Sequence, residues 1–508
     1  MDVKFRAAEP TTTPAGLLAV GLHEGALAAG SQGARLDRAS KGAVKALFAS
    51  GDFAGRVGET ALLYTNGVKA KRVLLVGLGP AKELSDRRVL TAAASASRRA
   101  REAGAGTLAV AFPDSVLGRP ERLRAAAEGI VLGHHRHTAY LSSSKAPLKG
   151  AELLADRAAT AADRAAIVAG VMRGEAVALA RDLASTPSQD LVPSQLAERA
   201  AETARRIGAK VTVLEPAAME RLGMGCVLAV GRGSPNPPRF VELVHEPTRG
   251  KRGGKRGGKP GAVPTVVVIG KGVTFDTGGV SIKPREGMNK MKYDMSGSAV
   301  VIGLFAALPT LELPFRVVGL IPSAENVTGS HAVKPGDVIR AMDGTTIEVT
   351  NTDAEGRLLL ADALVYARRH APVAVVDLAT LTGAMSIALG RHSAGLFSAD
   401  DALANELHAA VERTGERLWR MPLWPEFLTE MRGDTADLVN SSERREGGSC
   451  SAAAFLWHFA KDMPWAHLDI ASTAWTYNER PDAMRGPNAF GVRLLTDWLE
   501  RRAAAAKR

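Results

Sequence analysis

Short apolar runs, glycine-rich turns and alanine-rich stretches alternate along the whole chain. The run at residues 73–77 is rich in leucine and valine and ends in glycine, which is typical of a buried strand. Residues 90–105 have the alanine- and arginine-rich composition of a helix, and residues 107–112 form the next apolar run. This strand–helix–strand order predicts a parallel sheet with a crossover connection in the first part of the chain.

The same alternation continues to the end of the chain after one long helix. That helix is expected at residues 161–184, and it should end before Pro187 because proline disfavours a helical conformation in the residue before it. A new helix is expected soon afterwards, with Pro193 just outside it and Ser194 as its N-cap. The clearest strands beyond it are residues 265–269, 315–321 and 374–378.

The length of the chain predicts more than one domain. With 508 residues it is too long for one compact core, and its strands alternate with helices, so we expect an α/β protein with two domains. We place a small N-terminal α/β domain at residues 1–165, a connector helix at 166–186 and a larger α/β domain at 187–508.

Composition is that of an ordinary globular protein and excludes several classes. Hydrophobic residues make up 46% and charged residues 23%, which excludes wholesale disorder and collagen-like or coiled-coil chains. No apolar run approaches the ~18–20 residues of a transmembrane helix, and the N-terminal stretch lacks the apolar core of a secretory signal. The two cysteines, Cys226 and Cys450, form no CxxC pair, so we expect buried thiols and a cytoplasmic protein.

The excess of positive charge is concentrated in two short segments. Of the net charge of +12, residues 249–259 supply +6 and residues 501–508 supply +4, which leaves +2 for the rest. This distribution argues against a basic groove built into the fold, although a weak, salt-sensitive attraction to polyanions stays open. Residues 250–258 repeat glycine, lysine and arginine without one apolar residue, so we expect a disordered surface loop between two strands.

Several catalytic signatures are absent from the sequence. It contains no HExxH zinc motif, no GxSxG nucleophile elbow and no GxxxxGK[ST] phosphate loop. Three histidines lie within residues 134–137, but spacings of one and two along a helix do not converge on one ion. We therefore interpret that cluster as a solvated helix face.

Two segments of the larger domain carry closely spaced acidic residues. In the first, Asp276 follows a buried strand within a glycine-rich loop, and Asp294 lies shortly after it; such loops are where α/β folds place their sites. In the second, Asp353 and Glu355 lie two residues apart before a helix, so they point the same way if the backbone is extended. The alternative is a capping box, in which Thr352 and Glu355 only stabilise that helix.

The coincidence of these groups favours a metal site. Four carboxylates and two lysines lie in glycine-rich loops after apolar strands, all within one domain. Four carboxylates balance the charge of two divalent cations, and oxygen ligands suit Zn²⁺, Mn²⁺ or Mg²⁺. A hydrolase with two metal ions ~3.5–4 Å apart is the chemistry that this set of residues predicts.

The two segments resemble a known enzyme family. GKGVTFDTGGVSIK at residues 270–283 and NTDAEGR at residues 351–357 are similar to the leucyl aminopeptidases, also called cytosol aminopeptidases. The resemblance extends over the larger domain, including residues 377–383 and 465–470, whereas the first domain resembles the family in layout only. It implies a mixed central sheet flanked by helices and a two-metal exopeptidase that removes N-terminal residues, preferentially leucine or other apolar residues, from peptides.

The resemblance also implies roles for the charged residues. Its metal ligands correspond to Lys271, Asp276, Asp294, Asp353 and Glu355. Asp276 and Glu355 would bridge two ions, either Mn²⁺ or Zn²⁺, Lys271 and Asp294 would complete one site, and Asp353 the other. As a ligand, Lys271 must lose a proton, which burial and a neighbouring dication both favour.

Two further residues correspond to catalytic groups of the family. Lys283 would polarise the scissile carbonyl group and stabilise its developing negative charge. Arg357 would hold a bicarbonate ion as general base, since the guanidinium fork suits a planar oxyanion. The side-chain pocket and the substrate backbone would be lined by Met291, Asn351, Thr380, Leu381 and Gly383.

Some features depart from the family pattern, and alternatives stay open. Ser472 stands where the family has glycine, residues 487–490 differ from the usual sequence, and the insertion at 249–259 is extra. A two-metal phosphoester hydrolase is the alternative enzyme, although a lysine ligand is unusual for it. The resemblance further implies a homohexamer, and DNA binding, known for some bacterial members, is possible here only through the basic segments and is not favoured.

Overall fold

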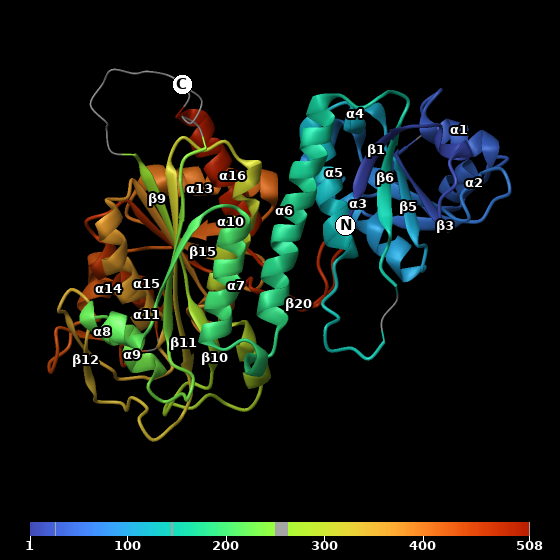
Figure 1. Ribbon diagram of the computed structural model, residues 1–508. Coiled ribbons are helices and arrows are strands. Elements are labelled where there is room, and N and C mark those ends of the chain that lie inside the picture. Colours follow the sequence, from blue (N-terminus) through green and yellow to red (C-terminus); the bar gives the residue numbers. More distant parts are fainter. Residues whose placement is uncertain (26, 144–145, 249–262, 445, 507–508) are drawn as a thin grey trace, which may run out of the picture. The chain divides into compact units, whose positions relative to one another are not determined.

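The computed structural model describes residues 1–25, 27–143, 146–248, 263–444 and 446–506, and it divides into two compact units (Figure 1). Unit 1 comprises Met1–Ala178 and Tyr477–Arg485, and unit 2 comprises Leu179–Thr476 and Gly486–Arg508. The division falls inside helix α6 (Ala161–Ser185), which is the helix expected as a connector. The domain boundaries drawn from the sequence stay a prediction.

Unit 1 contains a six-stranded sheet with the order β1-β6-β5-β2-β4-β3. All neighbours are parallel except β3, which runs antiparallel to β4. The expected parallel arrangement is therefore confirmed, with β2 between the two strands that the crossover joins. The strands are β1 (Val3–Ala7), β2 (Leu17–His23), β3 (Thr60–Leu63), β4 (Val73–Gly79), β5 (Thr107–Ala111) and β6 (Gly150–Ala155).

Helices cover both faces of this sheet (Figure 1). On one face, Leu18 and Val20 of β2 pack into a core with Leu36 of α1 and Val44 of α2. Helices α3 and α5 pack against each other, and α3 also contacts β4 and β5. The helices are α1 (Gln32–Ala39), α2 (Ala43–Ser50), α3 (Asp86–Glu102), α4 (Asp114–Leu117) and α5 (Pro120–His134), with 3₁₀ turns η1 (Pro10–Thr12) and η2 (Ala81–Glu83).

The histidine cluster of unit 1 is not the solvated helix face that the sequence suggested. Helix α5 ends at His134, so the following histidines lie beyond the helix. The Arg101 guanidinium donates to the carbonyl oxygens of His134 and His135 at 3.0 and 3.1 Å, which fixes the chain where it leaves the helix. Burial, with a contribution from the Arg101 charge, lowers the pKa of His134 to about 4.

Unit 2 is built on a nine-stranded mixed sheet, which confirms the expected fold class. Its order is β16-β15-β18-β14-β9-β11-β8-β7, and β10 pairs with the end of β11. The central strands β18, β14, β9 and β11 are parallel, whereas β15 and β8 run antiparallel to their inner neighbours. The strands are β7 (Lys210–Leu214), β8 (Arg239–His245), β9 (Thr265–Gly270), β10 (Gly272–Asp276), β11 (Arg316–Asn326), β14 (Ala374–Ala379), β15 (Ala394–Phe397), β16 (Leu418–Arg420) and β18 (Trp465–Asp469).

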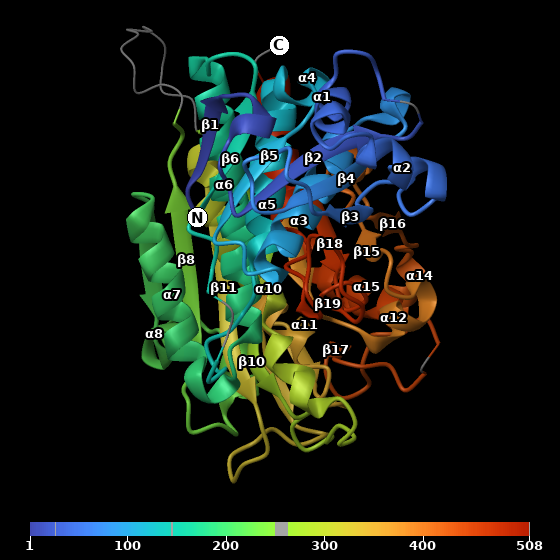
Figure 2. The ribbon, with the colours of Figure 1, turned by 90° about the vertical axis from the view of Figure 1, so that its right-hand side faces the viewer.

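Two helical layers enclose this sheet. Val267 and Ile269 of β9 pack with Leu359 of α11 and Phe455 of α15 in the core of one face, while α7 and α10 cover the other face (Figure 2). The helices are α7 (Pro193–Arg206), α8 (Pro216–Arg221), α9 (Gly225–Gly231), α10 (Ser296–Ala307), α11 (Gly356–Ala367), α12 (Gly383–Leu389), α13 (Asp401–Thr414), α14 (Pro425–Thr429), α15 (Gly448–Ala460) and α16 (Val492–Ala505). Short 3₁₀ turns are η3 (Ser188–Asp190), η4 (Met288–Tyr293), η5 (Leu308–Thr310) and η6 (Arg368–His370).

Two small sheets complete unit 2. One has the order β12-β13-β17 and lies next to the loop that carries Asp353, and the other joins β19 and β20. Their strands are β12 (Val338–Arg340), β13 (Thr346–Glu348), β17 (Leu438–Val439), β19 (Trp475–Thr476) and β20 (Gly486–Pro487). The pairing of β13 with β17 brings together chain segments that are about ninety residues apart, as in the Ile347–Leu438 pair.

Among the other expectations from the sequence, the N-cap of α7 is corrected and the buried cysteines are confirmed. Helix α7 begins at Pro193 with Val192 as N-cap, so Ser194 is not the cap; proline suits the first helical position because it needs no N–H donor there. The loop expected at residues 249–259 lies outside the described residues, between β8 and β9. Cys226 and Cys450 are free and buried, as expected. Within the described ranges, no helix combines the length and apolar character needed to cross a membrane.

Candidate metal centre and active site

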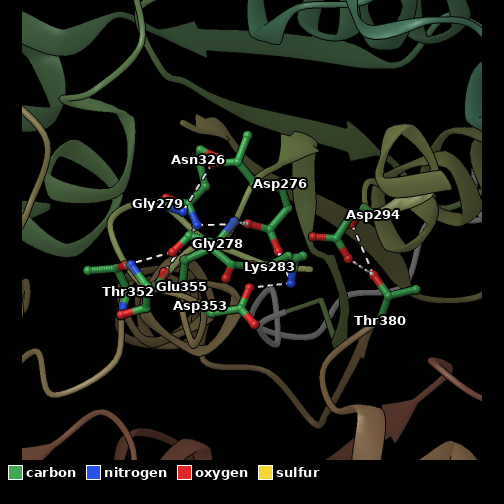
Figure 3. A network of polar contacts seen from close by, with 12 residues as sticks. Asp276, Gly278, Gly279, Lys283, Asp294, Asn326, Thr352, Asp353, Glu355 and Thr380 are labelled. Carbon is green, nitrogen blue, oxygen red and sulfur yellow. Dashed lines mark hydrogen bonds and ion pairs between the residues drawn. The ribbon is translucent and has the colours of Figure 1, made fainter. Parts of the chain in front are cut away.

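The candidate site lies where strands of the unit 2 sheet end. Lys271 follows β9, Asp276 is the last residue of β10, and Thr380 follows β14. Because β9 and β14 are parallel neighbours, their carboxyl ends reach the same edge of the sheet, which is where open α/β sheets place their sites. Asp353 and Glu355 come from the loop before α11, and the structure brings them to the same place (Figure 3).

Three carboxylates converge in this site. Asp276, Asp353 and Glu355 each offer an oxygen atom, and these atoms lie within 4.8 Å of one another. Asp276 and Glu355 are each only 2% exposed. Burial raises the pKa of Glu355 to about 8, with the neighbouring Asp276 charge adding to the effect. Burial likewise raises the pKa of Asp353. Acidic side chains buried so close together can stay ionised only if cations lie beside them to offset their charge.

Two lysines supply positive charge within the structure. Lys271 Nζ lies 2.8 Å from both Asp294 Oδ2 and Glu355 Oε1. Lys283 Nζ lies 2.7 Å from Asp276 Oδ2 and also pairs with Asp353. Burial alone would lower the pKa of each lysine, but the surrounding carboxylates outweigh it and raise both pKa values. Burial thus acts on the pKa of Lys271 in the direction expected from the sequence, and a dication next to the amine would act in the same direction and is needed for deprotonation.

Close backbone packing admits the Lys271 side chain to the site. The Lys271 Nζ atom donates a hydrogen bond to the Thr380 carbonyl oxygen at 3.0 Å. The aliphatic part of the Lys271 side chain passes over Gly356, the first residue of α11. A Cβ atom at Gly356 would approach the Lys271 Cε and Nζ atoms to 2.8 Å, closer than real Cβ contacts occur. Glycine at the start of α11 is thus a steric requirement of the lysine position.

Hydrogen bonds hold Asp276 in one orientation. Its Oδ1 accepts from Gly278 N and from Asn326 Nδ2, both at 2.8 Å. Asn326 Nδ2 also donates to the Thr352 carbonyl oxygen at 3.0 Å and so links this loop to the Asp353 loop. Asn326 was not expected from the sequence, where no motif distinguishes this polar residue at the end of the apolar strand β11.

The capping-box alternative is wrong. Glu355 is itself the N-cap of α11, and its side chain makes no capping hydrogen bond. The Thr352 hydroxyl instead donates to the Gly278 carbonyl oxygen at 2.6 Å and accepts from Ser281 N at 2.8 Å. Thr352 thus ties the two acidic loops together, and Glu355 is left free to face the other carboxylates.

Arg357 lies in the first turn of α11 and is 7% exposed. Its Nη1 donates to the Asn440 carbonyl oxygen at 2.7 Å. Its Nε is buried and has no hydrogen-bond partner among the described residues. Burial lowers the pKa of Arg357 to about 10, so the guanidinium stays charged at neutral pH. A buried cation with a free donor suits a small anion.

Three of the expected substrate-lining residues, Thr380, Asn351 and Leu381, form hydrogen bonds near the carboxylate cluster. The Thr380 hydroxyl donates to Asp294 Oδ1 at 2.5 Å, and Asn351 Oδ1 accepts from Asp353 N at 2.9 Å. Leu381 N donates at 3.2 Å to Asp469, a fully buried residue to which the sequence analysis gave no role. Met291 lies in η4, and Gly383 begins α12.

The donor set fits divalent cations. Glu355 Oε2 is a buried carboxylate oxygen that accepts no hydrogen bond within the described part of the chain. Buried polar atoms are rarely left without a partner, and a carboxylate oxygen facing two other carboxylates is a good ligand for a dication. The residues present therefore match a divalent metal centre.

Comparisons with known proteins match both parts of this chain to domains of one enzyme family. Residues 178–496 match the catalytic domain of the cytosol aminopeptidase family, and residues 19–144 match its N-terminal domain. A probable cytosol aminopeptidase of Roseiflexus castenholzii is 43% identical and covers 98% of this chain and 100% of its own. A probable cytosol aminopeptidase of Geobacter sulfurreducens is 41% identical and covers 98% of this chain and 99% of its own.

Solved structures give the same picture. The bottromycin maturation enzyme BotP in complex with Mn is 38% identical, has a TM-score of 0.82 and covers 96% of this chain and 100% of its own. A mutant of tomato leucine aminopeptidase is 31% identical, has a TM-score of 0.86 and covers 99% of this chain and 96% of its own. From its sequence, fold and carboxylate cluster, this chain belongs to the cytosol aminopeptidase family, whose members are divalent metal-dependent hydrolases that remove N-terminal residues.

Proposed function

We propose that this enzyme is a two-metal aminopeptidase that removes leucine and other apolar N-terminal residues from peptides. The observation that carries the proposal is the convergence of Asp276, Asp353 and Glu355 within 4.8 Å, with Lys271 and Asp294 beside them. Four carboxylates offset the charge of two dications. Asp276 and Glu355, the most buried of the converging three, are the residues we assign to both ions.

We assign Lys271 and Asp294 to one ion and Asp353 to the other, and we infer that the ions are Mn²⁺ or Zn²⁺. When bound, such ions supply Lewis-acid polarisation of the scissile carbonyl group and lower the pKa of a water molecule. Lys271 would then give up its pairing with Asp294 and Glu355 and offer a neutral amine.

The remaining chemistry is assigned to Lys283 and Arg357. The Lys283 side chain is 20% exposed, so its ammonium group can turn from its carboxylate partners towards a substrate. There it would donate a hydrogen bond to the carbonyl oxygen as negative charge develops, which stabilises the transition state. Arg357, whose Nε has no hydrogen-bond partner in the described part of the chain, would hold bicarbonate, and this base would take the proton of the attacking water.

Recognition of the substrate is assigned to the loops around the cluster. Met291 and Leu381 are both half-buried. We infer that they form the apolar wall of a side-chain pocket. Asn351, Thr380 and Gly383 would contact the substrate backbone. An apolar wall favours residues such as leucine because burying each additional methylene group contributes about 0.8 kcal/mol. We also propose a cytoplasmic location, in line with the names of the relatives.

The test is cleavage of leucine p-nitroanilide by the purified chain, with N-acetyl-leucine p-nitroanilide as the matched control. We expect cleavage of the first only, loss of activity on dialysis against a chelator, and recovery with Mn²⁺ or Zn²⁺. Metal analysis should return two equivalents. Cleavage of the acetylated control, or undiminished activity in protein shown to be metal-free, would overturn the proposal, as would a preference for phosphodiesters.

A further inference from the structure

Asn440 lies beside the loop that carries Asp353, although about ninety residues separate them along the chain. It directly follows β17, which pairs in parallel with β13, and the Asp353 loop follows β13. The side chain of Asn440 is completely buried. A buried amide can be accommodated only if both its oxygen and its nitrogen find partners.

The amide of Asn440 bonds to both ends of this loop. Its Oδ1 accepts from Thr350 N at 2.9 Å and from Asn351 N at 3.2 Å. Its Nδ2 donates to the Asn351 carbonyl oxygen at 2.7 Å and to the Ala354 carbonyl oxygen at 3.3 Å. The segment from residue 350 to residue 354 is therefore closed around one side chain, and Asp353 stands within it.

The main chain of Asn440 makes a further contact with the active site. Its carbonyl oxygen accepts from Arg357 Nη1 at 2.7 Å. This bond orients the guanidinium while leaving the Arg357 Nε without a partner among the described residues. One residue thus holds both the loop that bears a carboxylate of the cluster and the arginine of the first turn of α11.

We propose that Asn440 is a positioning residue for the metal centre, acting through Asp353 and Arg357 without touching an ion or the substrate itself. The inference rests on the proposed function. Asp353 needs such support because its side chain is 33% exposed and lies on a loop, whereas Asp276 ends a strand and is buried. Partners that orient metal ligands typically change metal affinity or activity by about 10–100-fold when they are removed.

The contacts require an amide in particular. Replacing Asn440 by aspartate keeps the shape and the acceptor for Thr350 N and Asn351 N. It removes the two N–H donors and turns a carboxylate oxygen towards two carbonyl oxygens, which repel it. Replacing Asn440 by alanine removes these side-chain bonds, and the one that the Thr350 hydroxyl donates to Asn440 Oδ1 at 3.3 Å, without adding a charge.

A matched control lies on the same segment. Asp437 Oδ2 accepts from Thr346 N at 2.8 Å and from the Thr346 hydroxyl at 2.6 Å. It thus joins the same two chain segments at the other end of their pairing and is exposed. Asp437→Asn weakens this junction without touching the Asp353 loop, so it reports the effect of loosening the pairing alone.

The experiment measures Mn²⁺ binding by titration calorimetry on the full chain after the metal has been removed with a chelator. We expect Asn440→Ala and Asn440→Asp to weaken Mn²⁺ binding at one of two sites by about tenfold or more. In protein saturated with Mn²⁺, kcat should fall more than KM rises. Asp437→Asn should leave the dissociation constants within about twofold. If the buried charge of Asn440→Asp prevents folding, the alanine variant decides.

A double-mutant cycle separates positioning from stability. In an Asp353→Ala background, Asn440→Ala should change the remaining Mn²⁺ affinity by no more than about twofold, because the ligand that it positions is gone. The inference is overturned if Asn440→Ala keeps wild-type Mn²⁺ affinity, or if its effect is undiminished without Asp353. A wild-type chain that binds no Mn²⁺ and cleaves no leucine p-nitroanilide would instead overturn the proposed function.

Discussion

Helix α11 carries two buried carboxyl groups that are held in opposite ways. Glu355 stands immediately before the helix, and Asp362 lies about two turns further along. Asp362 accepts backbone N–H bonds from Cys226 and Val227 at 3.0 Å and from Met342 at 2.9 Å. Glu355 has the Lys271 ammonium on one oxygen, and its other oxygen accepts no hydrogen bond within the described ranges.

The difference shows that the partners of a buried acid distinguish a structural role from a functional one. Burial raises the pKa of Glu355 to about 8 and that of Asp362 to about 7, so the pKa shift alone does not separate the two roles. The backbone amides around Asp362 have fixed directions and satisfy both oxygens. The Lys271 ammonium near Glu355 pairs with one oxygen only, so the other oxygen, which has no partner within the described ranges, is available to an ion.

The largest expected effect comes from removing the carboxylates assigned to both ions. Asp276→Ala and Glu355→Ala should each lower kcat/KM on leucine p-nitroanilide by on the order of a thousandfold or more, because the Lewis-acid chemistry depends on the ions. Metal analysis should return fewer than two equivalents in both variants. Two full equivalents in Glu355→Ala would contradict the assignment.

The next effect concerns groups that act at the site without holding an ion. Lys283→Ala should lower kcat by about 10²–10³-fold with both metal ions retained, since it removes a donor to the developing negative charge. Arg357→Ala should cost less, about 10–100-fold, because only the positioned base is lost. Steady-state kinetics combined with metal analysis measure both. A larger loss for Arg357→Ala than for Lys283→Ala would show that the two roles are reversed.

Asp362→Asn tests the structural side of the comparison. The amide nitrogen would face a backbone N–H in place of an acceptor, so we expect a loss of about 1–3 kcal/mol in the free energy of unfolding. Chemical denaturation measures this loss, and Mn²⁺ affinity and kcat should stay close to wild type. A selective loss of Mn²⁺ binding in this variant would mean that Asp362 also belongs to the functional site.

The pH dependence of the metal-free protein sharpens the comparison further. The pKa of Glu355 rises from 4.5 to about 8 on folding, so the folded state binds more protons than the unfolded state between these values. The free energy of unfolding should therefore fall as the pH rises from about 4.5 to 8, and the raised pKa values of Asp294 and Asp353 act in the same direction.

Urea denaturation of chelator-treated protein at pH 5 and at pH 8.5 measures this effect. Glu355→Gln should flatten the pH dependence, and added Mn²⁺ should abolish most of it because the ion replaces the proton. Stability that increases with pH in the metal-free wild type would contradict the role given to burial.

The smallest effect is expected from a change that alters neither carboxyl group. Replacing residues 249–259 by a short Gly-Ser turn should leave peptide cleavage and Tm nearly unchanged, because loop length contributes only about 0.6 kcal/mol per doubling. The same change should remove most of any DNA binding, which should already weaken steeply with salt. A gel-shift assay at two salt concentrations measures it. Tight binding that survives the replacement would place polyanion recognition in the rest of the protein.

Much of the site could be predicted because most of its charged residues come in two short segments. Lys271, Asp276 and Lys283 lie within thirteen residues of the chain, and Asp353, Glu355 and Arg357 within five. Local pattern sufficed for these residues, since glycine-rich loops after apolar strands permit close approach of a ligand. It did not suffice for the capping box, because that motif is identical in sequence whether Thr352 caps the helix or bonds across to Gly278.

The sequence by itself determined the alternation of strands and helices and the charged residues of the site, because hydrophobic periodicity and side-chain chemistry are local properties. Only the tertiary structure decided which residues support them: Asn326, Asn440 and Asp469 are polar side chains without a local signal, brought to the site by strand ends and strand pairing. Hydrogen-bond partners of this kind depend on contacts across fifty or ninety residues, and such contacts exist only once the sheets have formed.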